Sequence, residues 1–263
     1  MLHHCPVHRF KKTRAKFFVY PEGSIYNYFG DLIFPHKFYF ELNILTSCAL
    51  APLRENIFYL SGQLFQMAKI VFITGATAGF GKACAYKFAA HGYDLIINGR
   101  RAERLQEMAN EIENKYNVAV LQLPFDVRDE KAVFASIDSM PGEWKKIDVL
   151  INNAGLAAGR DYFDEADMND WNTMIDTNVK GFLYVAKAVS LLMVKQGHGH
   201  IINMGSIAGK EVYEKGNVYC ATKFAVDALS QSMRIDLLRH GIKVTAINPG
   251  AAETEFSIVR FKG

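Results

Sequence analysis

The chain has 263 residues, half of them hydrophobic, and a formal net charge of +3. This length and composition fit one globular α/β domain. Residues 1–66 hold seven Lys/Arg and four Asp/Glu, so residues 67–263 are neutral overall. A neutral body lacks the basic surface that binds nucleic acid or anionic lipid, so we expect neither a nucleic-acid nor a membrane partner.

The four cysteines show no paired spacing, which argues against both a zinc site and a disulfide framework. We therefore expect no metal and a reducing, cytoplasmic setting, with Cys84 and Cys220 as buried free thiols on helices. No uninterrupted apolar run approaches the roughly 18 residues that a transmembrane helix needs.

Residues 1–66 differ in character from the rest, because they are rich in aromatic residues but follow neither a helical nor a strand period. Three interpretations compete for them. A transit peptide would fit the basic, acid-free start, although the first serine is Ser24 and no amphipathic stripe is evident. An added small subdomain is the second interpretation. We favour the third, in which Met67 is the true start and residues 1–66, which we expect to be poorly ordered, come from an over-extended reading frame.

From Met67 onward, strand and helix patterns alternate. Strands are predicted at Lys69–Thr74, Asp94–Asn98, Val118–Phe125, Asp148–Ile151, Gly199–Met204 and Lys243–Asn248. Helices are predicted through Ala83, Phe88 and Ala89, along the stripe Leu105, Met108, Ala109 and Ile112, and over about Asp170–Gln196 and Asn217–His240. Apolar strands separated by helices predict a doubly wound parallel sheet of Rossmann type in residues 67–263, with ligands at the carboxyl ends of the strands.

The stretch FITGATAGFGKACAYKF breaks from strand to helix at Gly75, Gly79 and Gly81. Glycine permits the tight turn and the approach of backbone N–H groups to a pyrophosphate, and the helix N-terminus adds positive potential. A glycine trio alone is weak support, because such junctions also use glycine for steric reasons. The preceding strand and the following helix strengthen the prediction of a dinucleotide site.

The end of the second strand discriminates between the two nicotinamide cofactors. An NAD site would place an acid there to bind the ribose hydroxyl, but this chain has Asn98, Gly99, Arg100 and Arg101. A guanidinium can bind a 2′-phosphate through two hydrogen bonds, and arginines at the start of a helix are unfavourable without an anion. The sequence therefore predicts NADP(H).

The last predicted helix places Tyr219 and Lys223 one turn apart on its inward-facing stripe. A buried lysine needs a hydrogen-bonding partner. An ammonium beside a phenol favours the phenolate and prepares it to exchange a proton with a substrate oxygen. Ser206, which follows a strand at its carboxyl end, could bind the same oxygen. Asn178, on an apolar helix face, is either a satisfied core residue or part of a polar network.

These motifs, in this order and spacing, resemble those of the short-chain dehydrogenase/reductases: TGATAGFG (Thr74–Gly81), NNAG (Asn152–Gly155), Asn178, Ser206, YCATK (Tyr219–Lys223) and PGAAET (Pro249–Thr254). The resemblance implies an acid/base role for Tyr219, cofactor binding and tuning of Tyr219 by Lys223, substrate orientation by Ser206 and a water-holding role for Asn178. It further implies that the cofactor contacts Gly75, Thr77, Ala78, Gly79, Phe80, Gly81, Arg100, Arg101, Asp126, Val127, Asn153, Ala154, Gly155, Tyr219, Lys223, Pro249, Gly250, Thr254 and Phe256.

Within this family, residues 67–263 look most like the NADP-dependent 3-hydroxy acid dehydrogenases, which act on serine or on 3-hydroxypropionate and malonic semialdehyde. Arg160 and Lys210 are candidate contacts for a substrate carboxylate, although a solvated loop charge is the favoured interpretation of each. Two alternatives stay open: a reductase of another carbonyl class, such as a ketoacyl thioester, sugar or polyol, and a truncated, non-catalytic NADPH-binding protein.

Family members continue beyond the PGAAETEF segment with a further helix and an edge strand, so we expect this domain to be C-terminally truncated. The strand at Lys243–Asn248 is then expected at an open edge of the sheet, a liability for aggregation. The resemblance also implies a homotetramer for the complete protein.

Overall fold

The computed structural model describes residues 68–250 and, as backbone, four short strands before them. The chain forms two units, residues 1–41 and 42–263. In the first, strand β1 (Lys16–Val19) pairs antiparallel with β2 (Ile25–Tyr28). In the second, β3 (Ile57–Leu60) pairs antiparallel with β4 (Gln63–Gln66). The expected poor order of residues 1–66 falls mostly outside the described residues, and the boundary at Met67 stays a prediction.

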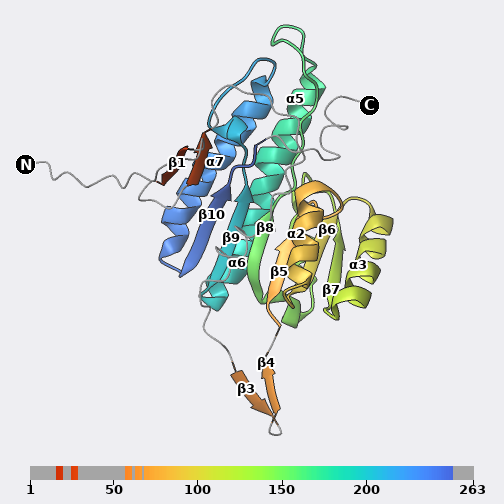
Figure 1. Ribbon diagram of the computed structural model, residues 1–263. Helices are drawn as coiled ribbons and strands as arrows, with labels where there is room; N and C mark the ends of the chain where they lie inside the picture. Colours follow the sequence, from red (N-terminus) through yellow and green to blue (C-terminus); the bar gives the residue numbers. More distant parts are fainter. Residues whose placement is uncertain (1–15, 20–24, 29–56, 61–62, 67, 251–263) are drawn as a thin grey trace, which may run out of the picture. The chain divides into compact units, whose positions relative to one another are not determined.

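Six parallel strands form the central sheet, in the order β10-β9-β8-β5-β6-β7 (Figure 1). Their bounds are β5 Ile70–Ile73, β6 Asp94–Gly99, β7 Val120–Pro124, β8 Ile147–Asn152, β9 Gly199–Met204 and β10 Ile242–Ile247. All six predicted strands are therefore present. In the described sheet β10 pairs with β9 alone, so it lies at an edge, as expected.

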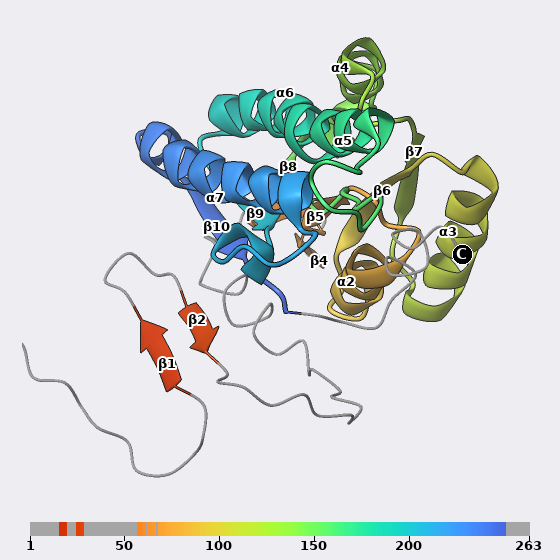
Figure 2. The ribbon, with the colours of Figure 1, turned by 90° about the horizontal axis from the view of Figure 1, so that it is seen from above.

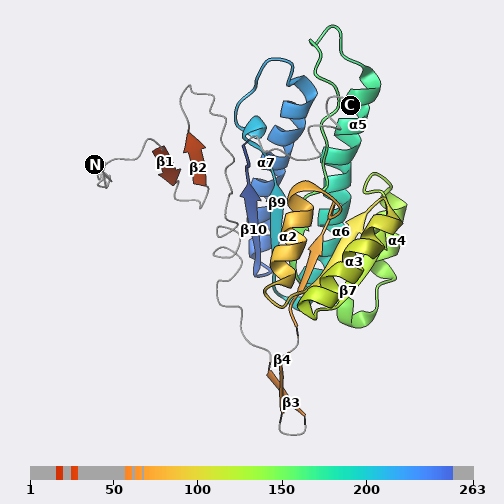
Figure 3. The ribbon, with the colours of Figure 1, turned by 45° about the vertical axis from the view of Figure 1, so that its right-hand side comes forward.

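Helices cover both faces of this sheet (Figure 2). One face carries α2 and α3, seen side by side in Figure 3, and the other carries α4, α5, α6 and α7. Their bounds are α2 Gly79–Ala89, α3 Ala102–Tyr116, α4 Glu130–Asp138, α5 Met168–Ile175, α6 Phe182–Gln196 and α7 Asn217–Leu238, with 3₁₀ turns η1 at Gly142–Lys145 and η3 at Ile207–Gly209. The doubly wound Rossmann-type fold is thus confirmed.

Two helical features differ from the sequence prediction. The long helix expected from Asp170 to Gln196 is interrupted by a π-helical turn, η2 (Asp176–Gly181), between α5 and α6. Such turns are frequent at functional sites. The short helix α4 was not predicted, because only Val133 and Ile137 mark its buried face. Asp129 starts it by accepting a 3.0 Å hydrogen bond from the N–H of Ala132.

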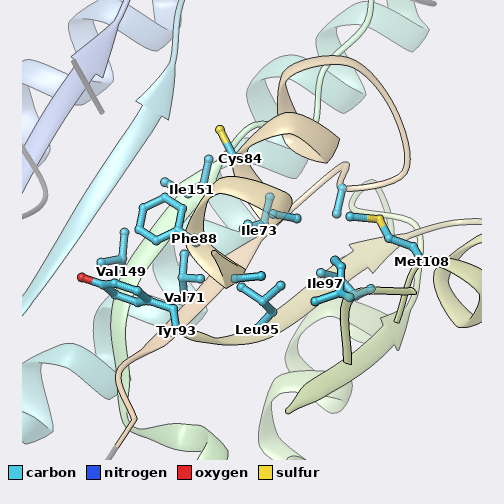
Figure 4. Close-up of a cluster of buried hydrophobic side chains, with 14 of the residues drawn as sticks. Val71, Ile73, Cys84, Phe88, Tyr93, Leu95, Ile97, Met108, Val149 and Ile151 are labelled. Carbon is cyan, nitrogen blue, oxygen red and sulfur yellow. The ribbon is translucent and has the colours of Figure 1, made fainter. Parts of the chain in front are cut away.

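The core consists of two layers, because alternate residues of each strand face opposite helices. Under α2 and α3 lies one set of alternate strand residues, such as Val71, together with Cys84, Phe88 and Met108 (Figure 4). The strand residues that alternate with these, such as Phe72, pack against α4, α6 and α7. Both faces of each strand are therefore apolar, as is typical of a parallel sheet covered on both sides.

Strand order reverses between β5 and β8, since the chain runs outward from β5 to β7 and then returns to start β8 beside β5. Ligands of doubly wound sheets bind at this switch point, outside the carboxyl ends of the strands. The glycine turn after β5 and the NNAG segment after β8 both lie there.

The stretch Met168–Gln196 is long and apolar enough for a membrane span by length and composition, with a mean hydropathy of 1.2 in its most apolar window. Half of that window is buried in the fold. This burial is what a core helix of a globular domain shows, and α6 packs on β8 and α4.

His200 on β9 is buried, and its Nε2 lies 2.9 Å from Oγ1 of Thr245 on β10. Burial, and secondarily the charge of Lys243, lower the pKa of His200 from 6.5 to about 4. The unfolded chain therefore binds one proton more than the folded chain between these two pH values. Stability is lost as the pH falls through this window.

We predict that His200→Gln, which keeps a polar partner for Thr245, flattens this acid dependence. The wild type should lose about 3 kcal/mol more unfolding free energy than the variant between pH 6.5 and 4. Denaturant unfolding over a pH series measures this difference. Parallel curves for the two proteins would show that folding does not lower the pKa of His200.

Candidate functional site

The turn after β5 presents uncapped backbone N–H groups at the start of α2. Gly75 and Gly79 have positive φ angles of 62° and 52°. No side chain caps α2, and its first turn holds no acid. A Cβ on Gly81 would collide with the Gly75 carbonyl and come within 2.6 Å of Nδ2 of Asn153. This geometry fits a pyrophosphate on the helix N-terminus.

Two polar side chains join this turn to the end of β8. Oγ1 of Thr74 accepts hydrogen bonds of 2.9 Å from the N–H groups of Asn153 and Ala154. Nδ2 of Asn153 donates to the carbonyl oxygens of Thr74 and Gly75, at 2.9 and 3.2 Å. The predicted cofactor residue Asn153 thus fixes both sides of the switch point.

Arg100 and Arg101 follow β6 at the same sheet edge, and both are exposed. Nη2 of Arg101 lies 3.4 Å from Oγ1 of Thr77, so the arginine pair adjoins the glycine turn. Asn98, just before them, donates hydrogen bonds to the carbonyls of Leu123, within β7, and Phe125, directly after it. Exposed guanidinium groups beside an uncapped helix N-terminus fit a dinucleotide that carries an additional phosphate.

Asp126 and Val127 directly follow β7. Val127 is buried, and a Cβ on Gly181 would lie 2.8 Å from its Cγ2, so the turn packs tightly on η2. Partial burial opposes ionisation of Asp126, but hydrogen bonds from Arg128 hold its pKa below the usual value. Asp126 is therefore a carboxylate at the edge where Arg100 lies.

Lys223 and Tyr219 lie on the buried face of α7, as predicted. The Lys223 Nζ donates a 2.9 Å hydrogen bond to the carbonyl of Met204, the last residue of β9. It lies 5.9 Å from the centroid of the Tyr219 ring. Burial lowers the pKa of Lys223 from 10.5 to about 8. The expected contact between ammonium and phenol ring is present.

Asn178 belongs to a closed polar network rather than to a single contact. It exchanges two hydrogen bonds with the backbone of Leu156, at 2.8 and 2.7 Å, and donates a 3.1 Å bond to Oγ1 of Thr222. Thr222 in turn donates to the carbonyl of Tyr219 at 2.8 Å. The network joins η2, the segment after β8 and α7. The sequence analysis did not identify Thr222. Its position directly before Lys223, on the buried side of α7, could have indicated its role.

Gly155 and Ser206 complete the inner surface of the site. A Cβ on Gly155 would come within 3.3 Å of Oδ1 of Asn178 and 3.7 Å of Nζ of Lys223, so glycine allows the backbone to pass both. Oγ of Ser206 accepts from the N–H of Ala208. The backbone N–H of Ser206 donates to Oδ1 of Asn248, a residue that the sequence analysis did not identify.

Other predicted residues lie close to the C-terminus or were expected to contact the substrate. Pro249 and Gly250 end the described chain, and the Pro249 carbonyl accepts the Ile207 N–H at 3.0 Å. Thr254 and Phe256 lie outside the described residues. Lys210 is not an available substrate contact, because its ammonium pairs with the Asp227 carboxylate at 2.6 Å.

Arg160, the other candidate for a substrate carboxylate, is exposed. Within residues 68–250 no group of three or more His, Cys, Asp or Glu side chains is arranged to bind a metal ion. Cys84 and Cys220 are buried free thiols, as expected.

The model of the short chain dehydrogenase family matches residues 69–262. This chain belongs to that family. An NADP-dependent 3-hydroxy acid dehydrogenase of Escherichia coli K12, YdfG, is 49% identical over 195 residues, which cover 74% of this chain and 77% of the relative. Sulfoacetaldehyde reductase 2 of Chromohalobacter salexigens is 46% identical over 198 residues, covering 75% and 78%.

Solved structures agree with the sequence relatives. The closed form of a serine dehydrogenase complexed with NADP+ superposes with a TM-score of 0.68 at 50% identity, covering 74% of this chain and 77% of that one. A serine dehydrogenase from Escherichia coli gives a TM-score of 0.65 at 48% identity, covering 69% and 82%.

The lowered pKa of Lys223 leads us to predict how the unfolding free energy changes with pH. Between pH 8 and 10.5 the unfolded chain holds a proton that the folded chain has released, so the stability contributed at this position rises with pH. Relative to Lys223→Met, the wild type should gain about 3 kcal/mol of unfolding free energy across this window.

Denaturant unfolding at several alkaline pH values measures the gain. Lys243→Met, which removes an exposed lysine from β10, is the matched control: it keeps Lys223, so its stability should rise with pH as that of the wild type does. Equal behaviour of the two variants would mean that the Lys223 ammonium is not destabilised by burial.

Proposed function

We propose that the protein is an NADP-dependent oxidoreductase acting on small 3-hydroxy acids, such as serine or 3-hydroxypropionate, and on the corresponding aldehydes. The observation that carries this proposal is the buried network of Lys223, Tyr219, Thr222 and Asn178 beside the glycine turn. The non-catalytic alternative, a protein that only holds NADPH, has no use for an ammonium kept beside a phenol.

In this proposal the bound cofactor supplies or accepts the hydride at the substrate carbon. Tyr219 donates its phenolic proton to the substrate oxygen in reduction and accepts it in oxidation. The Lys223 ammonium, fixed by the Met204 carbonyl, stabilises the phenolate that remains. Ser206, whose hydroxyl oxygen accepts from Ala208, donates its O–H to the same substrate oxygen.

Cofactor binding is assigned to the same sheet edge. The N–H groups at the start of α2 bind the pyrophosphate, and Arg100 and Arg101 bind the 2′-phosphate through charge-assisted hydrogen bonds. Asp126 and Val127 flank the adenine. Asn153 to Gly155 line the site between the glycine turn and Lys223, in agreement with the close approach of Gly155 to the Lys223 Nζ.

The names of the two relatives support one substrate class. A 3-hydroxy acid, once oxidised, and sulfoacetaldehyde both carry an anionic group one carbon away from the carbonyl. We therefore propose that the site recognises an alcohol or aldehyde with a carboxylate or sulfonate at this position. A sulfonate substrate is the second candidate, favoured by the 46% identity to the sulfoacetaldehyde reductase.

The substrate proposal is tested by following NADPH absorbance with NADP+ and three alcohols: 3-hydroxypropionate, 2-hydroxyethanesulfonate and the neutral 3-hydroxypropionamide. We expect kcat/KM to be highest for one of the anions and at least about tenfold lower for the amide, since it lacks the charge. A preference for the amide would refute an anionic substrate class.

Tyr219→Phe removes the proposed proton donor without changing the ring. We predict a fall in kcat of about 100- to 10,000-fold with almost unchanged affinity for NADP+. Steady-state rates and calorimetric titration separate the two effects. Tyr184→Phe on α6, which removes a hydroxyl away from the site, is the control and should keep full activity. Retained turnover in Tyr219→Phe would reject the assigned role.

We also propose that the protein assembles into a homotetramer and acts in the cytoplasm without nucleic-acid or membrane partners. An exposed apolar stripe on α7 supports self-association: Phe224 is 42% exposed, Ile235 76% and Leu238 72%. Large exposed apolar patches mark interaction sites. Two buried free thiols are consistent with a reducing compartment.

Ile235→Glu should dissociate this assembly, because the carboxylate would be buried in an apolar contact. Light scattering after size-exclusion chromatography measures the mass, which is expected to fall. Lys115→Glu on α3, on the opposite face of the sheet, is the control for altered charge. An unchanged mass for Ile235→Glu would place the interface elsewhere or show a monomer.

A further inference from the structure

Arg128 binds the Asp126 carboxylate at the sheet edge proposed for the cofactor. Its Nε lies 3.1 and 3.0 Å from Oδ1 and Oδ2 of Asp126, and its Nη2 lies 2.6 Å from Oδ2. The backbone N–H of Arg128 adds a fourth hydrogen bond, 3.0 Å to Oδ1. Both carboxylate oxygens are therefore occupied by one residue, and the pair is electrically neutral.

The backbone around Asp126 is fixed, so the carboxylate stays at this edge. Asn98 donates to the Phe125 carbonyl, and the Asp129 N–H donates to the Asp126 carbonyl at 3.1 Å. On the other side Val127 packs against Gly181 of η2. Strands β6 and β7 end side by side, with Gly99 opposite Pro124. Arg100 and Asp126 consequently follow two adjacent strand ends.

Because these strand ends are adjacent, the charge of Arg100 acts on Asp126. The charge of Arg100 contributes to the lowered pKa of Asp126, after the larger effect of Arg128. Without Arg128, the Asp126 carboxylate would attract the Arg100 guanidinium and repel a nearby phosphate dianion. Asp176, whose charge also raises the pKa of Arg128, pairs instead with Lys180, its carboxylate lying 2.8 Å from that ammonium.

We propose that Arg128 is a specificity-determining residue for the 2′-phosphate of the cofactor. By neutralising Asp126 it leaves Arg100 available to the phosphate and removes a repelling charge from the site. This inference rests on the proposed NADP dependence and extends it to a residue that acts through Asp126 rather than by contact with the cofactor.

The test measures binding by calorimetry, independent of turnover, with NADP+, NAD+, adenosine 2′,5′-bisphosphate and AMP. Four proteins are compared: wild type, Arg128→Met, Asp126→Asn and the double variant. Arg128→Met should weaken the binding of NADP+ and of the bisphosphate about tenfold. It should weaken the binding of NAD+ and AMP much less, because an unpaired carboxylate discriminates only against the added phosphate. Asp126→Asn in the Arg128→Met background should restore most of the lost affinity for NADP+ and the bisphosphate.

Lys145→Met is the matched control, because it removes one cation from η1, which directly precedes β8 at the opposite, amino-terminal edge of the sheet. It should leave the affinity for all four ligands unchanged, and thermal unfolding verifies that every variant is folded. Equal weakening of NADP+ and NAD+, or no recovery in the double variant, would overturn the inference. A wild type that does not prefer NADP+ to NAD+ would instead refute the proposed cofactor, and this inference with it.

Discussion

The buried ammonium of Lys223 is the constraint on which the rest of this site depends. A lysine held among apolar groups is costly, and it is tolerated here because the carbonyl at the end of β9 accepts a hydrogen bond from its ammonium. That hydrogen bond joins α7 to the end of β9. Gly209 lets η3 approach α7 closely, since a Cβ there would lie 2.5 Å from the Lys223 carbonyl oxygen. Tyr219, one turn earlier, is then directed to the same sheet edge.

Short polar side chains hold the strand ends in register around this pair. Thr74 and Asn153 join β5 to β8, Asn98 joins β6 to the end of β7, and Asn248 fixes the turn after β9. Each satisfies backbone groups that a strand leaves unpaired where it ends. The site is therefore built mainly from backbone positions locked by side chains, which suits recognition of a ligand rich in phosphates.

The sequence predicted the parts of the fold that rest on local pattern. Continuous apolar strands, the stripe on α3 and the inward face of α7 follow from residue spacing alone, and so did the pairing of Tyr219 with Lys223. The π-helical turn at Asp176–Gly181 was not predictable in this way, because no local period marks it. The partners of Asn178 and Ser206, namely Thr222 and Asn248, come from segments far apart in the chain. The ion pair of Lys210 with Asp227 was likewise not predictable, because it joins two different elements of the fold.

The protonation equilibrium of Lys223 tests the account most directly. Carbon-13 labelling of the lysine side chains, with the Lys223→Arg variant to assign the signal, allows its titration to be followed by NMR in the cofactor-free protein. The account predicts a midpoint near pH 8, well below the 10.5 of a solvated lysine. A midpoint at or above 10.5 would show that the ammonium is solvated, and the buried network proposed to activate Tyr219 would not exist.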